Sequence, residues 1–462
     1  MPRELITVQV GQCGNQMAWR FWDLALREHA QYNKSGIFDE PMSSFFRNVD
    51  PQYANPQNIP VGQPINTLKA RSVVIDMEEG VLNQLLRSDL GELFDSRQFI
   101  MDVSGAGNNW AHGFYEYGSK YENIIIDQVR RVAEQCDSLQ SFFLMHSMGG
   151  GTGSGVGTRT LGILADNFPE IFRFSTVVYP ENDVVTGPYN AVLAMNELTE
   201  HADCVLPIDN QALMDILYNI ENSKRKEKGV KTEITDLGES KVQSFTKMNN
   251  IIAHMLNNLT CSMRFEGMLN VDLNEITMNL VPFPKMQYLI SSISPLYSIL
   301  DVKMEPRRLD QIFSDVIDRD FQLLKVDPRH STYLACGLIL RGDAKIADIH
   351  RNVNRIKPDM RMINWNQEGF KIGLCNEPPV GMPYSLLCLS NNSAIKNQFG
   401  ALKQKFLKLY KRKANVHHYT NFMEAAHFDE ALRSLDDLIG RYEEIDIPKE
   451  EAPINRIRPL VA

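Results

Sequence analysis

A glycine-rich stretch, HSMGGGTGSGVGT at residues 146–158, is the first candidate for chemistry in this sequence. Six of its thirteen residues are glycine, and none is lysine or arginine. It follows a strand-like run at 142–146 and precedes a helical pattern that begins near Val156. Backbone N–H groups at the start of a helix attract anions, and glycines let a ligand approach the backbone closely. The stretch therefore predicts a phosphate-binding loop.

This loop fits neither of two familiar phosphate motifs. The Gly-x-Gly-x-x-Gly register of dinucleotide-binding folds is absent, and no Gly-Lys-Ser/Thr follows as it does in P-loop proteins. Without a lysine, the charge of the phosphates must be balanced by backbone dipoles and a Mg²⁺ ion. Close packing of a helix on a sheet is the alternative role of these glycines.

Two other turns are of the same kind, GQCGNQ at 11–16 and SGAGNNW at 104–110. Each alone is equally well explained as a simple turn between a strand and a helix. Together with the first loop, they favour one ligand that all three contact.

The elements that must position these turns are short β-rich runs, which alternate with helical segments through the first 220 residues. The runs are 5–10, 73–76, 142–146, 174–179 and 205–209. This alternation predicts a parallel α/β sheet, in which ligands bind beyond the carboxyl ends of the strands. Polar residues in the turns at these ends are Gln12, Asp76, Glu78, Asp183 and Asn210.

Composition limits the class of protein. The chain has 462 residues, 43% hydrophobic and 23% charged, which is typical of a soluble globular protein with two or three domains. Its net charge of −9 disfavours general binding to nucleic acid or anionic membranes, and no stretch is apolar enough to span a bilayer. Seven cysteines without paired spacing favour free thiols in a reducing compartment, the cytoplasm.

Six motifs together resemble the tubulin family from one end of the chain to the other. They are GQCGNQ at 11–16, GAGNNW at 105–110, GGGTGSG at 149–155, Asp209-Asn210, RFEG at 264–267 and NVDLNE at 270–275. The glycine signature is shared with the bacterial division GTPases, whereas the other motifs are specific to tubulins. Four further segments resemble the epsilon branch of the family: FWDLALREHA at 21–30, SSFFRNVD at 43–50, PRRLDQ at 306–311 and WNQEG at 365–369.

The resemblance implies a domain order. A GTP-binding α/β domain with a parallel sheet would cover residues 1–222, and a polar, charge-dense insert or linker would cover 223–244. A smaller α/β intermediate domain, which includes a core helix, would follow at 245–400. A C-terminal helical region would cover 401–462.

The resemblance also implies a site for GTP or GDP. The nucleotide would be bound by Gln12, Cys13, Asn108, Ser147, Gly150, Gly151, Thr152, Gly153, Asp183, Asn210, Phe245 and Asn249. Glu78 and Asp76 would hold Mg²⁺ through water, as that ion prefers. Asn210 and Asn249 would read the guanine edge, because an amide both donates and accepts hydrogen bonds. Phe245 would stack on the base, with plain core packing as its alternative.

Glu275 resembles the catalytic residue of alpha-tubulin, which acts on the nucleotide of the next subunit in a head-to-tail array. A carboxylate near a γ-phosphate can orient the attacking water. The resemblance thus implies a possible GTPase site that two chains share, with Glu275 acting in trans. The alternative is that Glu275 is a solvated surface acid of a chain that never stacks in this way.

Four features depart from the family or lie outside the implied site. Gly187 stands where alpha- and beta-tubulins have a glutamate, which puts the second ribose contact in doubt. The sequence ends RIRPLVA at 456–462 without a run of glutamates, so partners that need an acidic tail should not recognise it. The basic helix face at 403–413 is expected to be solvated rather than bound to an acidic partner. His417-His418 is expected to be structural.

The epsilon resemblance implies a cytoskeletal component of centrioles and basal bodies, in the centrosome and at the base of the cilium, needed for triplet microtubules. Its partners would be other tubulins, such as delta-tubulin, alpha/beta-tubulin or a second copy head to tail, and centriolar proteins. A GTP-bound scaffold that never polymerises is the alternative function. A metabolic enzyme with a dinucleotide cofactor is disfavoured because the Gly-x-Gly-x-x-Gly register is absent from the glycine-rich stretch.

Overall fold

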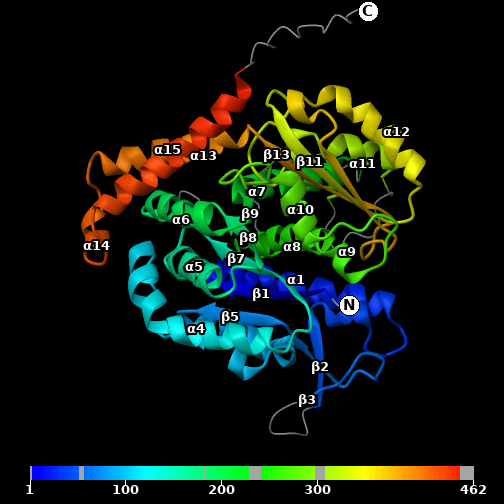
Figure 1. The fold of residues 1–462 in the computed structure, drawn as a ribbon, viewed down its shortest axis with the longest axis horizontal. Coiled ribbons are helices and arrows are strands. Elements are labelled where there is room, and N and C mark those ends of the chain that lie inside the picture. The colour runs from blue at the N-terminus through cyan, green and yellow to red at the C-terminus, as the bar shows by residue number, and fades with distance from the viewer. Residues whose placement is uncertain (1–2, 51–56, 181–183, 228–240, 297–306, 448–462) are drawn as a thin grey trace, which may run out of the picture.

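The computed structural model describes residues 3–50, 57–180, 184–227, 241–296 and 307–447. Within these ranges it contains a six-stranded parallel sheet, a four-stranded mixed sheet and a three-stranded antiparallel sheet. Figure 1 shows the two larger sheets in separate halves of the molecule, with the C-terminal helices along one side.

The parallel sheet has the strand order β6-β5-β1-β7-β8-β9. In that order the strands span Phe99–Met101, Ser72–Asp76, Glu4–Val10, Leu139–Ser147, Phe172–Val178 and Cys204–Ile208. This arrangement confirms the predicted parallel α/β sheet. Of these six strands, β6 has no matching prediction, because three residues carry too little pattern to be recognised.

Helices cover both faces of this sheet, so its strands are buried on both sides. Ile6, Val8 and Val10 of β1 pack into the core beneath one set of helices, and Leu5 packs into the core on the other face. The first set comprises α4 (Gly118–Ala133), α5 (Gly157–Asn167) and α6 (Gly187–His201). The second comprises α1 (Gly11–Tyr32), α3 (Glu79–Arg87) and α8 (Lys241–Leu259).

The mixed sheet has the order β10-β13-β11-β12, spanning Ile290–Ser294, Ser385–Asn392, Tyr333–Arg341 and Phe370–Cys375. Its helices are α9 (Cys261–Arg264), α10 (Leu273–Leu280), α11 (Leu309–Asp315) and α12 (Ile346–Ile356). The backbone of Val205 in β9 exchanges two 2.9 Å hydrogen bonds with Gln287 and Leu289. The two larger sheets are therefore joined through backbone hydrogen bonds.

A buried ion cluster also links the two halves. Glu28 of α1 pairs with Arg341 of β11 at 2.7 Å and with Arg264 of α9 at 2.8 Å, and all three side chains are buried. Burial opposes ionisation, but the two guanidinium groups hold the pKa of Glu28 below its usual value. The cluster is therefore charged and fixes α1 against the second half of the molecule.

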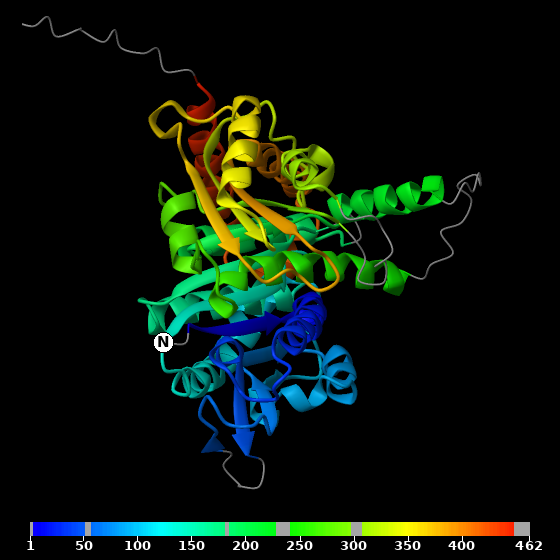
Figure 2. The same ribbon diagram turned by 90° about the vertical axis from the view of Figure 1, so that its right-hand side faces the viewer.

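The C-terminal helices α13 (Ile395–Tyr410), α14 (Val416–Thr420) and α15 (Ala426–Asp446) pack against α6. Tyr189 of α6 has its ring 5.3 Å from Phe406, 5.6 Å from Tyr419 and 5.2 Å from Phe428. In Figure 2 these helices lie behind the second half of the molecule, and the parallel sheet lies below both.

Helix α7 (Asn210–Glu227) and helix α8 extend into both ends of the predicted insert at 223–244. These ends are helical, whereas 228–240 lie outside the described residues, and the assignment of 223–244 as an insert or linker stays a prediction. The domain boundaries themselves stay a prediction. A separate small sheet joins β2 (Phe46–Asp50) to β3 (Gln57–Asn58) and β4 (Thr67–Ala70), after the short helix α2 (Glu40–Ser43).

All seven cysteines have free thiols, as their spacing predicts. In the described part of the chain, no helix is both long and apolar enough to cross a membrane.

Candidate functional site

Four of the predicted site segments follow parallel strands and therefore meet at one edge of the sheet. Gly11 begins α1 directly after β1, and Asp76 ends β5. Ser147 ends β7, and Asn210 begins α7 two residues after β9. This carboxyl edge is where open parallel sheets bind ligands.

The glycine loop folds back tightly on the strand that precedes it. After β7, a single π-helical turn at Thr152–Val156 leads into α5. A Cβ atom on Gly153 would lie 2.8 Å from Ser147 Oγ and 2.9 Å from the Ser147 carbonyl oxygen. A Cβ atom on Gly14 would lie 2.1 Å from the Met145 carbonyl oxygen. Gly153 in this loop and Gly14 in α1 are therefore required for close packing. Close packing is the alternative role of glycine that the sequence left open.

Gly150 is different, because a Cβ atom there would meet its neighbours only at ordinary contact distances. The nearest atoms to a Cβ there would be Asn108 Oδ1 at 3.7 Å and Ser147 Oγ at 4.0 Å. Three predicted phosphate contacts, from two different loops, thus border the same space. Polar groups around a glycine backbone are what a phosphate cradle requires.

The loop at 104–110 lies directly against the loop at 146–158. A Cβ atom on Gly151 would lie 2.6 Å from the Ala106 carbonyl oxygen and 2.8 Å from the Asn109 amide nitrogen. Asn108 has φ 53°, in the left-handed region. Asparagine tolerates this conformation better than most non-glycine residues, and hydrogen bonds from its surroundings can hold it there.

Asn190 on α6 holds the backbone of Asn108 in place, a role that its local sequence does not predict. Its Nδ2 donates to the carbonyl oxygens of Asn108 at 2.9 Å and Gly149 at 2.8 Å. Its Oδ1 accepts from the Trp110 amide at 2.9 Å and from the Tyr419 hydroxyl at 2.5 Å. The only available signal was one asparagine beside a run of apolar residues, which identifies a buried polar group but not its partners.

Two carboxylates stand beside the second loop. Asp76 is 2% exposed, and its Oδ2 accepts no hydrogen bond from the described residues. Burial raises the pKa of Asp76 to about 6. A Cβ atom on Gly105 would lie 2.5 Å from Glu78 Oε1, so the Glu78 carboxylate faces this loop.

These carboxylates suit Mg²⁺ bound together with a nucleotide. No cluster of three or more metal-ligating side chains occurs among the described residues. Magnesium usually takes only one or two carboxylates and completes its shell with phosphate oxygens and water. An unpaired oxygen on Asp76 and a second carboxylate beside the phosphate cradle fit that arrangement.

The remaining predicted contacts lie around this edge. Gln12 is exposed, and Cys13 is half-buried, with burial raising the pKa of its thiol to about 12. Asn210 begins α7, and Asn249 lies on the neighbouring helix α8. Phe245, one turn before Asn249, is 39% exposed, and its stacking on the base stays a prediction. Thr152 is half-buried in the π-helical turn.

Asp183, the predicted ribose contact, and the RIRPLVA terminus lie outside the described residues. Gly187 begins α6 and is buried. Most lysine and arginine side chains of the basic face at 403–413 are exposed. Lys403 is half-buried and pairs with Asp436 at 2.6 Å. His417 and His418 are exposed.

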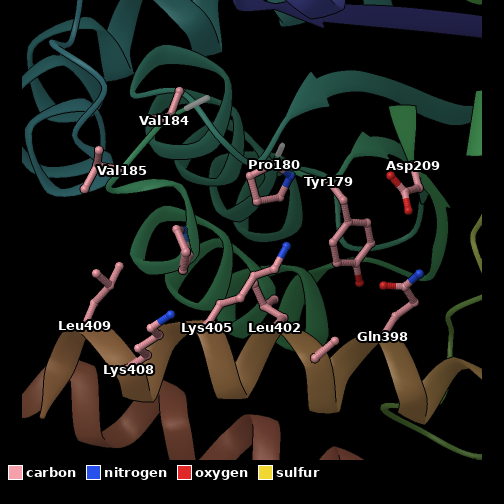
Figure 3. Close-up of a pocket in the computed structure, with 12 residues that line it drawn as sticks. Tyr179, Pro180, Val184, Val185, Asp209, Gln398, Leu402, Lys405, Lys408 and Leu409 are labelled. Carbon is pink, nitrogen blue, oxygen red and sulfur yellow. The ribbon is translucent and has the colours of Figure 1, made fainter. Parts of the chain in front are cut away.

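A pocket of about 320 Å³ adjoins this edge but is separate from the predicted site (Figure 3). Tyr179, Pro180 and Asp209 form one wall, and Lys405 and Lys408 of α13 face them. Among the described residues, none of the predicted nucleotide contacts lines it. Burial raises the pKa of Asp209.

Glu275 lies at the opposite edge of the parallel sheet. It is in the first turn of α10, its side chain is 45% exposed, and it pairs with Lys371 of β12 at 2.7 Å. Asp272, just before this helix, pairs with Arg3, which directly precedes β1. The glycine loops lie at the other end of β1. A strand rises about 3.3 Å per residue, so this strand separates the two edges by roughly 25 Å.

Comparison with known proteins agrees with this architecture. The family model for the Tubulin/FtsZ family, GTPase domain, matches residues 4–218, and that for the Tubulin C-terminal domain matches 284–404. The chain is 53% identical to the human and mouse proteins named Tubulin epsilon chain, over 96% of each chain. It is 33% identical to the Tubulin beta-2 chain of Suillus bovinus, over 98% of this chain and 99% of that protein. The resemblance to tubulins and to their epsilon branch is thereby confirmed, and the chain belongs to the tubulin family as a guanine-nucleotide-binding protein of the cytoskeleton.

Proposed function

We propose that this chain binds GTP with Mg²⁺ at its carboxyl edge and completes the GTPase site of a neighbouring tubulin with Glu275 at its opposite edge. The observation that supports this proposal is the separation of Glu275 from the glycine loops of the same chain. Across roughly 25 Å of β1, the carboxylate cannot reach its own nucleotide. In a head-to-tail array, however, the carboxyl edge of one subunit meets the opposite edge of the next.

At the carboxyl edge, the backbone around Gly150 and the side chains of Ser147 and Asn108 would hold the phosphates. Asp76 and Glu78 would hold Mg²⁺ through water, and the ion would balance the phosphate charge that no lysine offsets. Asn210 and Asn249 would select guanine, with Phe245 against the base. Gln12, Cys13, Gly151, Thr152, Gly153 and Asp183 would complete the contacts.

At the opposite edge, Lys371 holds the Glu275 carboxylate at the surface. Brought to the γ-phosphate of a neighbour, this carboxylate would orient the attacking water, which is the main contribution that phosphoryl transfer needs from protein. Neither chain alone would then contain a complete catalytic site.

The similarity to Tubulin epsilon chain supports a role in centrioles and basal bodies, at the centrosome and the base of the cilium, in forming or maintaining triplet microtubules. The partners would be other tubulins, among them delta-tubulin, alpha/beta-tubulin or a second copy of this chain, together with centriolar proteins.

The nucleotide released on denaturation tests the binding half of this proposal. The purified chain should release about one guanine nucleotide per molecule, and prior treatment with a Mg²⁺ chelator should lower that yield. Release of NAD, or of no guanine nucleotide, would contradict the proposal. GTP that stays intact in every assembly with other tubulins would instead favour the non-polymerising scaffold.

A further inference from the structure

Asn190 connects three segments that are far apart in sequence. It is fully buried, and both of its amide hydrogens go to backbone carbonyls, one in each glycine loop. Its carbonyl oxygen accepts one hydrogen bond from the second loop, at Trp110, and one from Tyr419 of α14. All polar atoms of this side chain are thus engaged, and each loop is held by at least one of them.

The C-terminal contact of this network has further support. Asn109, inside the second glycine loop, donates its Nδ2 to the His418 carbonyl oxygen at 2.9 Å. The Tyr189 hydroxyl donates to the Ala414 carbonyl oxygen at 2.9 Å. The segment 414–420 is therefore fastened to helix α6 at Ala414 and to the second glycine loop at His418.

No other side chain can replace this asparagine without loss. An aspartate keeps the acceptor but removes both donors, and a leucine removes all four bonds. Each group that loses its partner would stay buried. The free-energy cost of such a group exceeds the net stabilisation that one hydrogen bond gives. The loops would then be free to move apart where Gly150, Asn108 and Ser147 border the proposed phosphate site.

We propose that Asn190 and Tyr419 are positioning residues for the phosphate site, and that the segment 414–420 belongs to the nucleotide-binding unit. This inference rests on the proposed binding of GTP at the glycine loops. It adds a coupling between that nucleotide and the C-terminal helices.

The chain contains a matched control for this network. Asn391 is also fully buried, and its Nδ2 donates to the carbonyl oxygens of Leu280 at 2.9 Å and Met286 at 2.8 Å. The Tyr442 hydroxyl donates to its Oδ1 at 3.4 Å. This second asparagine and tyrosine lie away from the glycine loops, so their loss tests stability alone.

The experiment compares Tyr419→Phe with Tyr442→Phe in the full-length, nucleotide-bound chain. Both variants keep the ring and lose one buried hydroxyl. Guanine nucleotide release is followed by a chase with unlabelled GTP, and thermal unfolding is measured in parallel. Loss of the hydrogen bond from Tyr419 to Asn190, which holds both loops, should speed release about fivefold in Tyr419→Phe. Tyr442→Phe should release nucleotide at the wild-type rate.

A purely structural role would lower the unfolding temperature of both variants and leave both release rates unchanged, which would overturn the inference. Asn190→Asp should release nucleotide faster still, and Tyr419→Phe decides the question if that variant does not fold. A wild-type chain that holds no guanine nucleotide would contradict the proposed function instead, so the two failures are distinguishable.

Discussion

The glycines of one loop have two separate tasks, which single substitutions can distinguish. Gly150→Ala adds a methyl group beside Asn108 and Ser147, at ordinary contact distances of 3.7 Å and 4.0 Å from their side-chain oxygens. The fold should therefore keep its stability, while the affinity for GTP falls at least tenfold because the methyl group occupies the place of a phosphate. Equilibrium binding of a fluorescent GTP analogue and unfolding in urea measure the two effects.

Gly153→Ala is the matched control at the same loop. Its methyl group would lie within 2.9 Å of two atoms of Ser147, so the loop must shift. The expected cost is about 1–3 kcal/mol of unfolding free energy, whether or not nucleotide is present. Equal stability losses in the two variants, or unchanged GTP affinity in Gly150→Ala, would show that the space beside Gly150 is not the phosphate site.

Residue types and spacing predict which loops form the site, because glycine density and strand ends are local features. They cannot predict Asn190, since its four partners lie in segments up to 229 residues away and only the folded chain brings them together. The exposure of Phe245 is likewise a tertiary property. Periodicity places this residue on a helix but does not show what covers it.

Among the elements, α1, α9 and β11 are fixed to one another by the Glu28 ion cluster. Glu28→Gln would leave Arg264 and Arg341 buried without a countercharge, which costs about 3–5 kcal/mol. Urea unfolding at neutral pH should show this loss. Asp23→Asn is the control on the same helix, because its 3.0 Å pair with Arg27 is exposed and contributes less than about 1 kcal/mol. Similar losses in both variants would contradict a charged, interlocking cluster.

The order of the elements was largely predictable, because parallel strands leave continuous apolar runs and their turns carry the polar residues. The segment 223–244 shows the limit of that reasoning. Its charge density resembles that of a linker, yet α7 continues to Glu227 and α8 begins at Lys241. Charged residues are compatible with an exposed helix, so composition alone could not separate the two.

For the whole molecule, the decisive feature is that the phosphate cradle and Glu275 occupy opposite edges of one sheet. Under the proposed function, such a chain would supply half of a GTPase site at each end, and repetition along an array would complete every site except those at the ends of the array. A scaffold that never stacks would have no use for the second half. The rate of GTP hydrolysis should therefore depend on which two chains meet, and not on the residues of either chain alone.

Mixed assembly of two complementary variants tests this claim most directly. Glu275→Gln keeps its own phosphate cradle and is loaded with γ-labelled GTP, whereas Gly150→Ala keeps Glu275 but binds GTP poorly. In head-to-tail assemblies, each variant alone should release phosphate at least tenfold more slowly than the wild type. The account predicts that the mixture recovers hydrolysis of the labelled GTP. A mixture as inactive as Glu275→Gln alone, or full hydrolysis by Glu275→Gln alone, would contradict a site shared between two chains.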